Sequence, residues 1–288
     1  MPNLKTFKKI GFIGLGLLGG SIAKLIKSEF PNIELFAITN SQETIKQAKS
    51  LNIIHDGNTS ISCLPKDLDL VFICTPISLI LPSIEKITNH ITNPNLIITD
   101  IASVKEEICS NIPKLKFQHL FIPGHPMAGT EKTGFIFSDK QILKDAPYIL
   151  IPQKDKRYDL FKSFINKLFF NTIEMKPSQH DKLVCLASHI PYLLSCLTVS
   201  ATSELAKKEN DLLKSIISTG FRDTTRVAQS AANWGTEVCQ ANNKSIINAL
   251  ENTKNSLENL IELVKNSKDP ELFNWLSSQK SARNNLYT

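Results

Sequence analysis

The sequence has 288 residues, of which 42% are hydrophobic and 21% are charged, with a formal net charge of +6. This composition excludes a disordered or low-complexity chain, and the length favours about two domains with separate cores. The lysines are scattered and form no basic run with interleaved aromatic residues, so we expect no nucleic-acid partner.

The start of the chain predicts a protein without a secretory signal. It reads MPNLKTFKKIGFIGLG, in which the lysines are followed directly by a glycine loop with no apolar segment between them. The longest apolar stretch, residues 184–201, is interrupted by polar residues and Pro191, which favours a buried helix over a membrane span. Six cysteines occur without a CxxC pair, as is typical of free thiols in a reducing compartment. We therefore expect a cytoplasmic protein with no membrane partner.

Short apolar runs recur up to about residue 176 and predict strands. The expected strands are Lys9–Ile13, Glu34–Ile38, Leu70–Cys74, Asn95–Thr99, His119–Ile122, Tyr148–Ile151 and Thr172–Met175. Helical stretches lie between several of them, at Ser21–Ser28, Ser41–Leu51 and Ser78–Thr88. Strand and helix alternate in this way in parallel βαβ units, so the first part of the chain is predicted to be an α/β domain with a mostly parallel sheet.

The strand pattern stops at Pro177, and a helical pattern continues almost to Asn266. Ser178-Gln179-His180-Asp181 resembles a capping box at the start of the first helix. We therefore predict two domains, residues 1–176 and an all-α domain of residues 177–288. Apolar residues at helical spacing from Ile246 to Val264 would form a broad stripe. This stripe packs either inside the domain or against a second copy of the chain.

A glycine-rich sequence, Gly14-Leu15-Gly16-Leu17-Leu18-Gly19, directly follows the first predicted strand and opens a predicted helix. In this context GxGxxG is typical of dinucleotide-binding domains of the Rossmann type. The first glycine makes a tight turn, the second lets the backbone approach the pyrophosphate, and the third lets helix and strand pack closely. We therefore predict that these six residues bind a dinucleotide cofactor.

The end of the second strand bears on the choice between NAD and NADP. Thr39, Asn40 and Ser41 lie about 20 residues beyond the last glycine, where an acidic residue normally binds the ribose 2′-hydroxyl of NAD. An acid would repel a 2′-phosphate, whereas these side chains can donate hydrogen bonds to one, although no arginine follows them. We expect NAD or NADP, with a slight preference for NADP.

Three further segments follow predicted strands and so come out at the same edge of the sheet as the glycine loop. Cys74-Thr75-Pro76 either lines the dinucleotide or simply leads into the next helix. The second segment is Asp100–Lys105, and the third, Gly124–Gly134, contains His125. A histidine in a Gly- and Pro-rich loop can act as a base because its unperturbed pKa is about 6.5, although it more often bonds to backbone. The convergence of these segments favours the base.

Four motifs resemble those of the prephenate dehydrogenases and arogenate dehydrogenases. They are DxxSVK at 100–105, GHPxAGTEKxG at 124–134, SHxP at 188–191 and GFxDxTRxA at 220–228, in the family's order. The resemblance implies an NAD(P)-dependent oxidative decarboxylation of prephenate to 4-hydroxyphenylpyruvate, in tyrosine biosynthesis. It also implies a Rossmann-like domain followed by a helical domain, with a homodimer formed through the helical domain.

The resemblance implies roles for residues of this sequence. His125 would be the catalytic base for the ring C4 hydroxyl, and Ser103 would orient His125 and the nicotinamide. Arg226 would bind a substrate carboxylate, for which its planar bidentate donors suit it. Asp223, one helical turn earlier, would hold part of the site or a subunit contact. The other residues expected to bind substrate are Thr130, Glu131, His189, Tyr192 and Trp234.

The sequence departs from the family pattern at Tyr192, where many members have a second histidine. Tyr192 is predicted to lie on the same helix face as His189 and to contact the substrate side chain. The choice between prephenate, which carries a keto group, and arogenate, which carries an amine, therefore stays open. His180 is predicted to lie on the opposite helix face from His189, as an end-of-helix residue, so we expect no metal site.

Two remoter alternatives stay open. One is another dehydrogenase of the β-hydroxyacid type, or an imine reductase with a helical dimer domain, neither of which would need the GHPxAGTEKxG motif. The other is a non-catalytic nicotinamide-binding regulator, since a fold does not fix a function. The presence of Ser103, His125 and Arg226 together favours an enzyme over a regulator.

Overall fold

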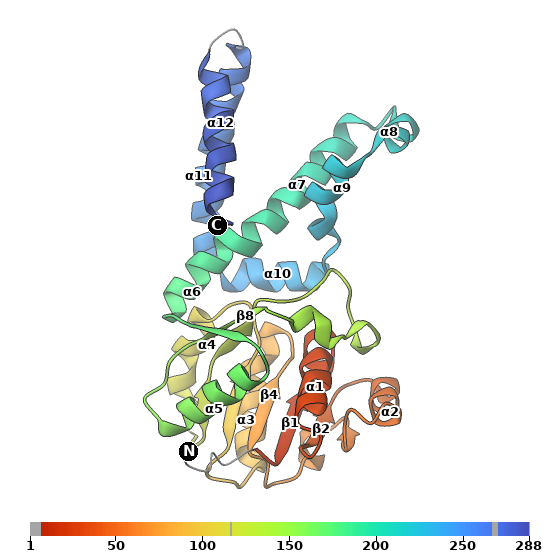
Figure 1. Cartoon of the computed structure of the whole chain (residues 1–288), viewed down its shortest axis with the longest axis vertical. Coiled ribbons are helices and arrows are strands. Elements are labelled where there is room, and N and C mark those ends of the chain that lie inside the picture. The colour runs from red at the N-terminus through yellow and green to blue at the C-terminus, as the bar shows by residue number, and fades with distance from the viewer. Residues whose placement is uncertain (1–6, 116, 267–269, 288) are drawn as a thin grey trace. The chain divides into compact units, whose positions relative to one another are not determined.

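The structure, a computed structural model, describes residues 7–115, 117–266 and 270–287. The chain forms two compact units, the first ending at Asn243 and the second beginning at Lys244 (Figure 1). Both sheets and all residues predicted for the site belong to the first unit.

Parallel strands form the central sheet of the first unit. They are β1 (Lys9–Ile13), β2 (Glu34–Ile38), β3 (Asp56–Asn58), β4 (Leu70–Ile73), β5 (Ile97–Asp100) and β6 (Leu120–Ile122). Their order is β3-β2-β1-β4-β5-β6, so the winding of the chain reverses between β1 and β4. Open α/β sheets bind ligands at the carboxyl ends of the strands at such a point, and the glycine sequence 14–19 begins there.

Helices cover both faces of this sheet (Figure 1). Side chains of β1 alternate between two apolar clusters, with Ile10 and Phe12 in one and Ile13 in the other. The first cluster includes residues of α1 (Leu17–Glu29), α2 (Gln42–Ser50) and α5 (Lys156–Lys167). The second includes residues of α3 (Ile80–His90) and α4 (Glu106–Asn111). Short 3-10 turns are η1 (Ile61–Cys63), η2 (Ile77–Leu79), η3 (Ile112–Lys114), η4 (Phe135–Phe137) and η5 (Lys140–Leu143).

A smaller sheet carries His125. Its strands are β7 (Gly124–Pro126), β8 (Pro147–Leu150) and β9 (Asn171–Glu174), with β7 antiparallel and β9 parallel to β8. The prediction that His125 lies in a loop is therefore wrong, since its backbone lies opposite Ile149 in the middle of β7. Glycine and proline on either side disfavour a strand locally, and only pairing with β8 makes one.

A continuous helical segment follows the sheets. It consists of α6 (Pro177–Val184), a π-helical turn η6 (Cys185–His189) and α7 (Ile190–Leu205). Pro191 has no N–H to donate and its ring crowds the preceding turn, which accounts for the wider π turn before it. The first unit is completed by α8 (Asn210–Ile216), α9 (Thr219–Thr225), the 3-10 turn η7 (Arg226–Gln229) and α10 (Ala232–Ala241).

The predicted capping box at residues 178–181 is wrong. α6 begins at Pro177 after Lys176, and no described side chain caps it. Asp181 is instead fully buried, and its carboxylate accepts hydrogen bonds from the backbone N–H groups of Lys105 (2.7 Å) and Glu106 (2.9 Å). Asp181 therefore joins α6 to the start of α4, a contact that local spacing in the sequence does not reveal.

The segment Pro177–Leu205 is long and apolar enough, by length and composition alone, to cross a membrane. Only 28% of its most apolar window is buried, so the prediction of a buried helix is wrong for the single chain. Leu183, Leu186 and Leu197 are among its exposed side chains. Clustered apolar side chains on a surface are typical of a contact with another molecule.

The second unit consists of α11 (Asn243–Lys265) from Lys244 onward and α12 (Pro270–Asn285). In the predicted apolar stripe of α11, Ile246 is buried, but Ile247, Leu257, Ile261 and Val264 are exposed. Within the described residues of this unit, most of the stripe is therefore not covered. The predicted boundary near residue 176 lies between β9 and α6, and a separate domain of residues 177–288 stays a prediction.

Candidate active site

The glycine loop between β1 and α1 packs tightly on one side and is open on the other. Gly14 has a φ of +92°, and a Cβ there would lie 2.6 Å from the carbonyl oxygen of Cys74. A Cβ on Gly19 would lie 2.7 Å from the carbonyl oxygen of Gly14. A Cβ on Gly16 would have no atom within 4 Å, and Gly16 precedes α1 without a side-chain cap from any described residue. Free backbone N–H groups at an open helix start fit a pyrophosphate.

Two buried hydroxyl groups, in the segments after β4 and β5, lack a partner among the described residues. Oγ1 of Thr75, which follows β4, and Oγ of Ser103, which follows β5, make no hydrogen bond with any described residue. Buried polar atoms without a partner are rare in folded proteins, so a ligand is expected to supply one. Cys74, Thr75 and Ser103 are placed by the strands that were predicted to present them to the dinucleotide.

At the end of β2, Thr39 is half-buried, whereas Asn40 and Ser41 are exposed. Oγ of Ser41 caps α2 by accepting a hydrogen bond from the backbone N–H of Thr44 (3.1 Å). Ser41 therefore has a local structural role, and the side chains of Thr39 and Asn40 are the ones left free of described hydrogen bonds at this strand end.

His125 in β7 belongs to a chain of three buried side chains. Its Nδ1 lies 2.9 Å from Nε2 of His180, and Nδ1 of His180 lies 2.6 Å from Oδ1 of Asp181. The two carboxylate oxygens of Asp181 already accept backbone N–H groups, so Nδ1 of His180 is the donor to Asp181. Nε2 of His180 is then the acceptor for Nδ1–H of His125. The Nε2 lone pair of His125 is left available, which is the state a general base needs.

The three histidines of this region are neutral at neutral pH. Burial, together with the nearby His180, Lys105 and His189, holds the pKa of His125 well below its usual range. Burial outweighs the hydrogen bond to Asp181 and lowers the pKa of His180. Burial also lowers the pKa of His189 to about 4. Desolvation disfavours the charged imidazolium in each case.

A buried ion pair supports the segment that carries Ser103. Nζ of Lys105 lies 2.5 Å from Oδ2 of Asp100 and 2.8 Å from the carbonyl oxygen of Ala102. Oδ1 of Asp100 accepts the backbone N–H of Gly124 (3.2 Å), the residue before His125. The pair therefore links the Ser103 segment to β7, and both charged groups have the additional hydrogen bonds that a buried pair requires.

His189 ends the π-helical turn and is fully buried. Its Nδ1 lies 3.3 Å from Nδ2 of Asn242, which also donates to the backbone carbonyl oxygen of Asp181 (2.9 Å). Its Nε2 has no partner among the described residues. Trp234 of α10 contacts His189 edge-on, with ring centroids 6.3 Å apart.

Tyr192 lies beside the same tryptophan, with ring centroids 5.2 Å apart. Its hydroxyl packs against α10, because a Cβ on Gly235 would lie 2.5 Å from the Tyr192 oxygen. Tyr192, Trp234 and His189 therefore form one group of side chains, and their role in lining a substrate pocket stays a prediction. The hydroxyl of Tyr192 faces the α10 backbone within this group.

Arg226 and Glu131 meet from distant parts of the chain. Nη1 of Arg226 in η7 lies 3.4 Å from Oε2 of Glu131, in the segment after β7. The Arg226 side chain is 59% exposed, so donors of its guanidinium stay open to a ligand. Thr130 is also exposed, and its Oγ1 accepts the backbone N–H of Lys132. Asp223 is exposed and has no hydrogen bond or ion pair with a described residue, so the structure does not bring it into this group.

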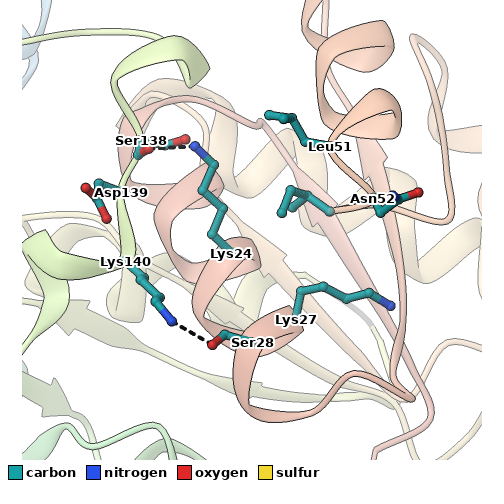
Figure 2. Close-up of a pocket in the computed structure, with 9 residues that line it drawn as sticks. Lys24, Lys27, Ser28, Leu51, Asn52, Ser138, Asp139 and Lys140 are labelled. Atoms are coloured by element: carbon teal, nitrogen blue, oxygen red, sulfur yellow. Dashed lines mark hydrogen bonds between the residues drawn. The ribbon is translucent and has the colours of Figure 1, made fainter.

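A separate hollow of about 510 Å³ lies between α1, the residues after α2 and the segment around Ser138 (Figure 2). Its lysines already have partners. Nζ of Lys24 donates to the carbonyl oxygen of Ser138, Nζ of Lys27 to that of Pro31, and Nζ of Lys140 to the hydroxyl of Ser28. None of the predicted site residues lines this hollow, so it is not part of the candidate active site.

Comparison with known protein families accounts for this arrangement. The model of the prephenate dehydrogenase nucleotide-binding domain matches residues 22–170, and that of the prephenate dehydrogenase dimerization domain matches residues 176–278. This chain belongs to the prephenate dehydrogenase family. The predicted resemblance is confirmed, and so is the fold class of a Rossmann-like domain followed by helices.

Individual proteins of known sequence or structure also resemble this chain. Prephenate dehydrogenase of Lactococcus lactis is 31% identical over 255 residues, which cover 88% of this chain and 70% of the relative. The crystal structure of Synechocystis arogenate dehydrogenase is 32% identical with a TM-score of 0.78, covering 96% of this chain and 99% of that one. Prephenate dehydrogenase of A. aeolicus, solved with hydroxyphenyl propionate and NAD⁺, is 28% identical with a TM-score of 0.88, covering 98% and 99%.

The match to a nucleotide-binding domain, together with the open glycine loop, supports binding of NAD or NADP by this family member. Three buried residues that support the candidate site, His180, Asp181 and Asn242, were not predicted from the sequence as site residues. His180 and Asp181 are adjacent in the sequence, but nothing local shows that they face His125. Asn242 follows α10 and has no motif around it. Their relation to the site is visible only in the fold.

Proposed function

We propose that this chain catalyses the NAD(P)-dependent oxidative decarboxylation of prephenate to 4-hydroxyphenylpyruvate. The observation that carries the proposal is the buried series His125–His180–Asp181, which leaves Nε2 of His125 as an acceptor at the sheet edge that also holds the glycine loop. The names of the relatives, prephenate dehydrogenase in Lactococcus lactis and Bacillus subtilis, support the same substrate.

Each proposed role answers one requirement of the reaction. A nicotinamide held by the glycine loop would supply the acceptor for the hydride from ring C4. Nε2 of His125 takes the proton of the C4 hydroxyl, a step for which general-base help is typically worth about 10²- to 10⁴-fold. The C1 carboxylate then leaves as carbon dioxide, its bonding electrons complete the aromatic ring, and the proton returns from His125 to the phenolate oxygen. Oγ of Ser103, which lacks a partner, is free to orient the reacting groups.

Arg226 is proposed to bind a substrate carboxylate. Its only described ionic partner is Glu131 at 3.4 Å, a distance that leaves the guanidinium able to turn towards a ligand. Trp234, Tyr192 and His189 are proposed to line the same pocket, and Thr130 and Glu131 to close it. Asp223, which stands apart from this group, is proposed as a subunit contact.

Arogenate dehydrogenase, which would produce tyrosine directly, is the second candidate. The Synechocystis arogenate dehydrogenase is 32% identical to this chain, and the Lactococcus prephenate dehydrogenase is 31% identical, so identity does not separate the substrates. Residue 192 is a tyrosine, so no imidazole is present at that position to contact the substrate side chain. The Tyr192 hydroxyl packs against Gly235. Prephenate is favoured by the majority of the named relatives.

The proposed cofactor is NAD or NADP, with a slight preference for NADP. Thr39 and Asn40 at the end of β2 carry no charge that would repel a 2′-phosphate. The complex of the A. aeolicus enzyme contains NAD⁺, which supports the use of that cofactor in the family.

The chain is proposed to act as a homodimer formed through its helical domain. The dimerization-domain match covers α7 and α11, and both helices carry exposed apolar side chains. Light scattering at several concentrations tests this, and a mass of one chain of 32.2 kDa throughout would contradict it. A cytoplasmic location without membrane or nucleic-acid partners stays a prediction.

The first experiment measures turnover with prephenate and with arogenate, each with NAD and with NADP, by the absorbance of the reduced nicotinamide. His125→Asn is expected to lower kcat by about 10²- to 10⁴-fold. His55→Asn, which alters an exposed histidine that contacts none of the candidate site residues, is the matched control. No turnover in any of the four combinations, with cofactor binding intact, would favour a non-catalytic regulator or a different substrate.

A further inference from the structure

The environments of the two ring nitrogens of His189 are unequal. Nδ1 lies 3.3 Å from the amide nitrogen of Asn242, and Nε2 is buried without a partner among the described residues. Both side chains are buried, with His189 at 0% and Asn242 at 5% exposure. A buried imidazole nitrogen without a hydrogen-bond partner lowers the stability of the fold, so a ligand is expected to supply the partner of Nε2.

The orientation of the Asn242 amide follows from its second contact. Nδ2 lies 2.9 Å from the backbone carbonyl oxygen of Asp181, which can only accept a hydrogen bond. The nitrogen end of the amide must therefore face Asp181, and its two hydrogens serve the Asp181 carbonyl and Nδ1 of His189. Because an amide nitrogen only donates, Nδ1 of His189 is the acceptor. The proton of the neutral ring is then on Nε2.

We propose that Asn242 is a positioning residue that fixes His189 as an Nε2–H donor to an oxygen atom of the substrate. The substrate contact rests on the proposed function, whereas the assignment of the tautomer does not. His189 would bind a carboxylate, hydroxyl or keto oxygen beside Trp234, which it contacts edge-on. Asparagine is suited to the task because it stays uncharged and its amide offers two donors in one plane.

Asp181 gives His125 and His189 opposite hydrogen-bonding roles. The side chain of Asp181 acts through His180 and leaves His125 with Nε2 as an acceptor. The backbone carbonyl of Asp181 holds Asn242, which leaves His189 with Nε2 as a donor. One histidine is thus prepared to take a proton and the other to donate a hydrogen bond, although both are neutral.

The test of the tautomers is a two-bond ¹H–¹⁵N correlation spectrum of the imidazole rings in the uniformly ¹⁵N-labelled full chain at neutral pH. The signals of His189 are assigned from the one set lost in His189→Gln. We expect the Nε2–H tautomer for His189 in the unmodified protein. The Nδ1–H tautomer, or a charged ring, would overturn the proposal.

The role of Asn242 is tested with Asn242→Ala against Asn243→Ala, the same change at the adjacent exposed residue. In Asn242→Ala we expect a mixture of both tautomers at His189, and in Asn243→Ala the spectrum of the unmodified protein. An unchanged His189 signal in folded Asn242→Ala would overturn the role of Asn242.

The substrate contact is tested by steady-state kinetics on the same two variants. Asn242→Ala is expected to lower kcat/KM for the turned-over substrate about tenfold, the usual worth of one hydrogen bond, while the Kd of the cofactor stays the same. Unchanged kcat/KM would overturn the contact with substrate. If neither prephenate nor arogenate is turned over by the unmodified protein, the proposed function fails, and the spectrum still decides the tautomer.

Discussion

Nδ1 of His125 and Nε2 of His180 lie 2.9 Å apart, and both rings are buried. His180 acts here as the acceptor, since its other nitrogen donates to Asp181. His125 is thereby held in the tautomer that has Nε2 free.

We therefore expect His180→Leu, which removes the acceptor, to lower kcat about 10- to 100-fold, part of the contribution of the general base. His180→Gln keeps an acceptor oxygen on a side chain of similar reach, so it should retain more activity than His180→Leu. Equal losses in the two variants, each shown to be folded by circular dichroism, would contradict the role of His180 as an acceptor.

Acidification should destabilise the protein. Burial lowers the pKa of His125, His180 and His189 in the folded chain, that of His189 to about 4, whereas an unfolded histidine titrates at about 6.5. Below pH of about 6.5 the unfolded chain binds protons that the folded chain does not, so the free energy of unfolding falls as pH falls. The loss is present below the unfolded pKa and for His189 continues to about pH 4.

Urea unfolding at pH 7.5 and pH 5 measures this effect. Each such histidine contributes up to about 1.4 kcal/mol per pH unit in this range. His189→Gln should show a smaller loss of stability between the two pH values, which separates the histidine from carboxylates. A free energy of unfolding that rises on acidification would refute the prediction.

Lys105→Met should destabilise the fold strongly. It leaves the carboxylate of Asp100, which is fully buried, without its counter-ion, and breaking a buried pair typically costs about 3–5 kcal/mol. The control is Lys49→Met, which breaks the exposed pair with Asp56 and should cost less than about 1 kcal/mol. Chemical unfolding of both variants measures the difference, and equal costs would show that the buried pair has no special role.

Alanine substitutions at two glycines of the loop should have different effects, one on stability and the other on cofactor binding. Gly19→Ala places a Cβ 2.7 Å from the carbonyl oxygen of Gly14, so it is expected to lower the free energy of unfolding by about 1–3 kcal/mol. Gly16→Ala meets no atom within 4 Å and should leave the stability nearly unchanged. It should still weaken cofactor binding about tenfold or more, because the methyl group lies where the pyrophosphate approaches. Calorimetric titration and thermal unfolding measure the two effects, and unimpaired cofactor binding by Gly16→Ala would argue against this site.

Asn40→Asp should shift the cofactor preference towards NAD. A carboxylate at the end of β2 binds the ribose 2′-hydroxyl and repels a 2′-phosphate, so the ratio of kcat/KM for NAD to that for NADP should rise about tenfold. Gln42→Glu introduces the same charge two residues later, in the first turn of α2, and should change the ratio much less. Equal shifts in both variants would point to a general effect of charge.

Much of the fold could be predicted from local patterns. Strands such as Leu70–Ile73 are buried on both faces of a parallel sheet, so they appear as uninterrupted apolar runs. The short strands β3 and β7 were not predicted, because Asp56–Asn58 is polar and Gly124–Pro126 combines glycine with proline. Such strands exist only through pairing with a neighbour.

In the candidate site, too, some residues could be predicted from local sequence and others could not. The segments that carry Ser103 and His125 were predicted to converge because they follow strands of one sheet, and parallel strands present their carboxyl ends at one edge. The role of Ser103 came only from the family resemblance. His180 was interpreted as an end-of-helix residue, since its sequence neighbours alone determine only its place on a helix. Its contact with His125 joins residues 55 positions apart.

The sequence by itself determined the alternation of strands and helices and the dinucleotide loop, because these follow from periodicity and from spacing along the chain. It also indicated the family, through the resemblance of four motifs. Only the tertiary structure decided which nitrogen of His125 and of His189 is an acceptor. Protonation of a buried imidazole depends on the groups within hydrogen-bond distance. These groups are His180, itself oriented by Asp181, for His125 and Asn242 for His189, and each comes from a distant segment that meets its partner only when the chain folds.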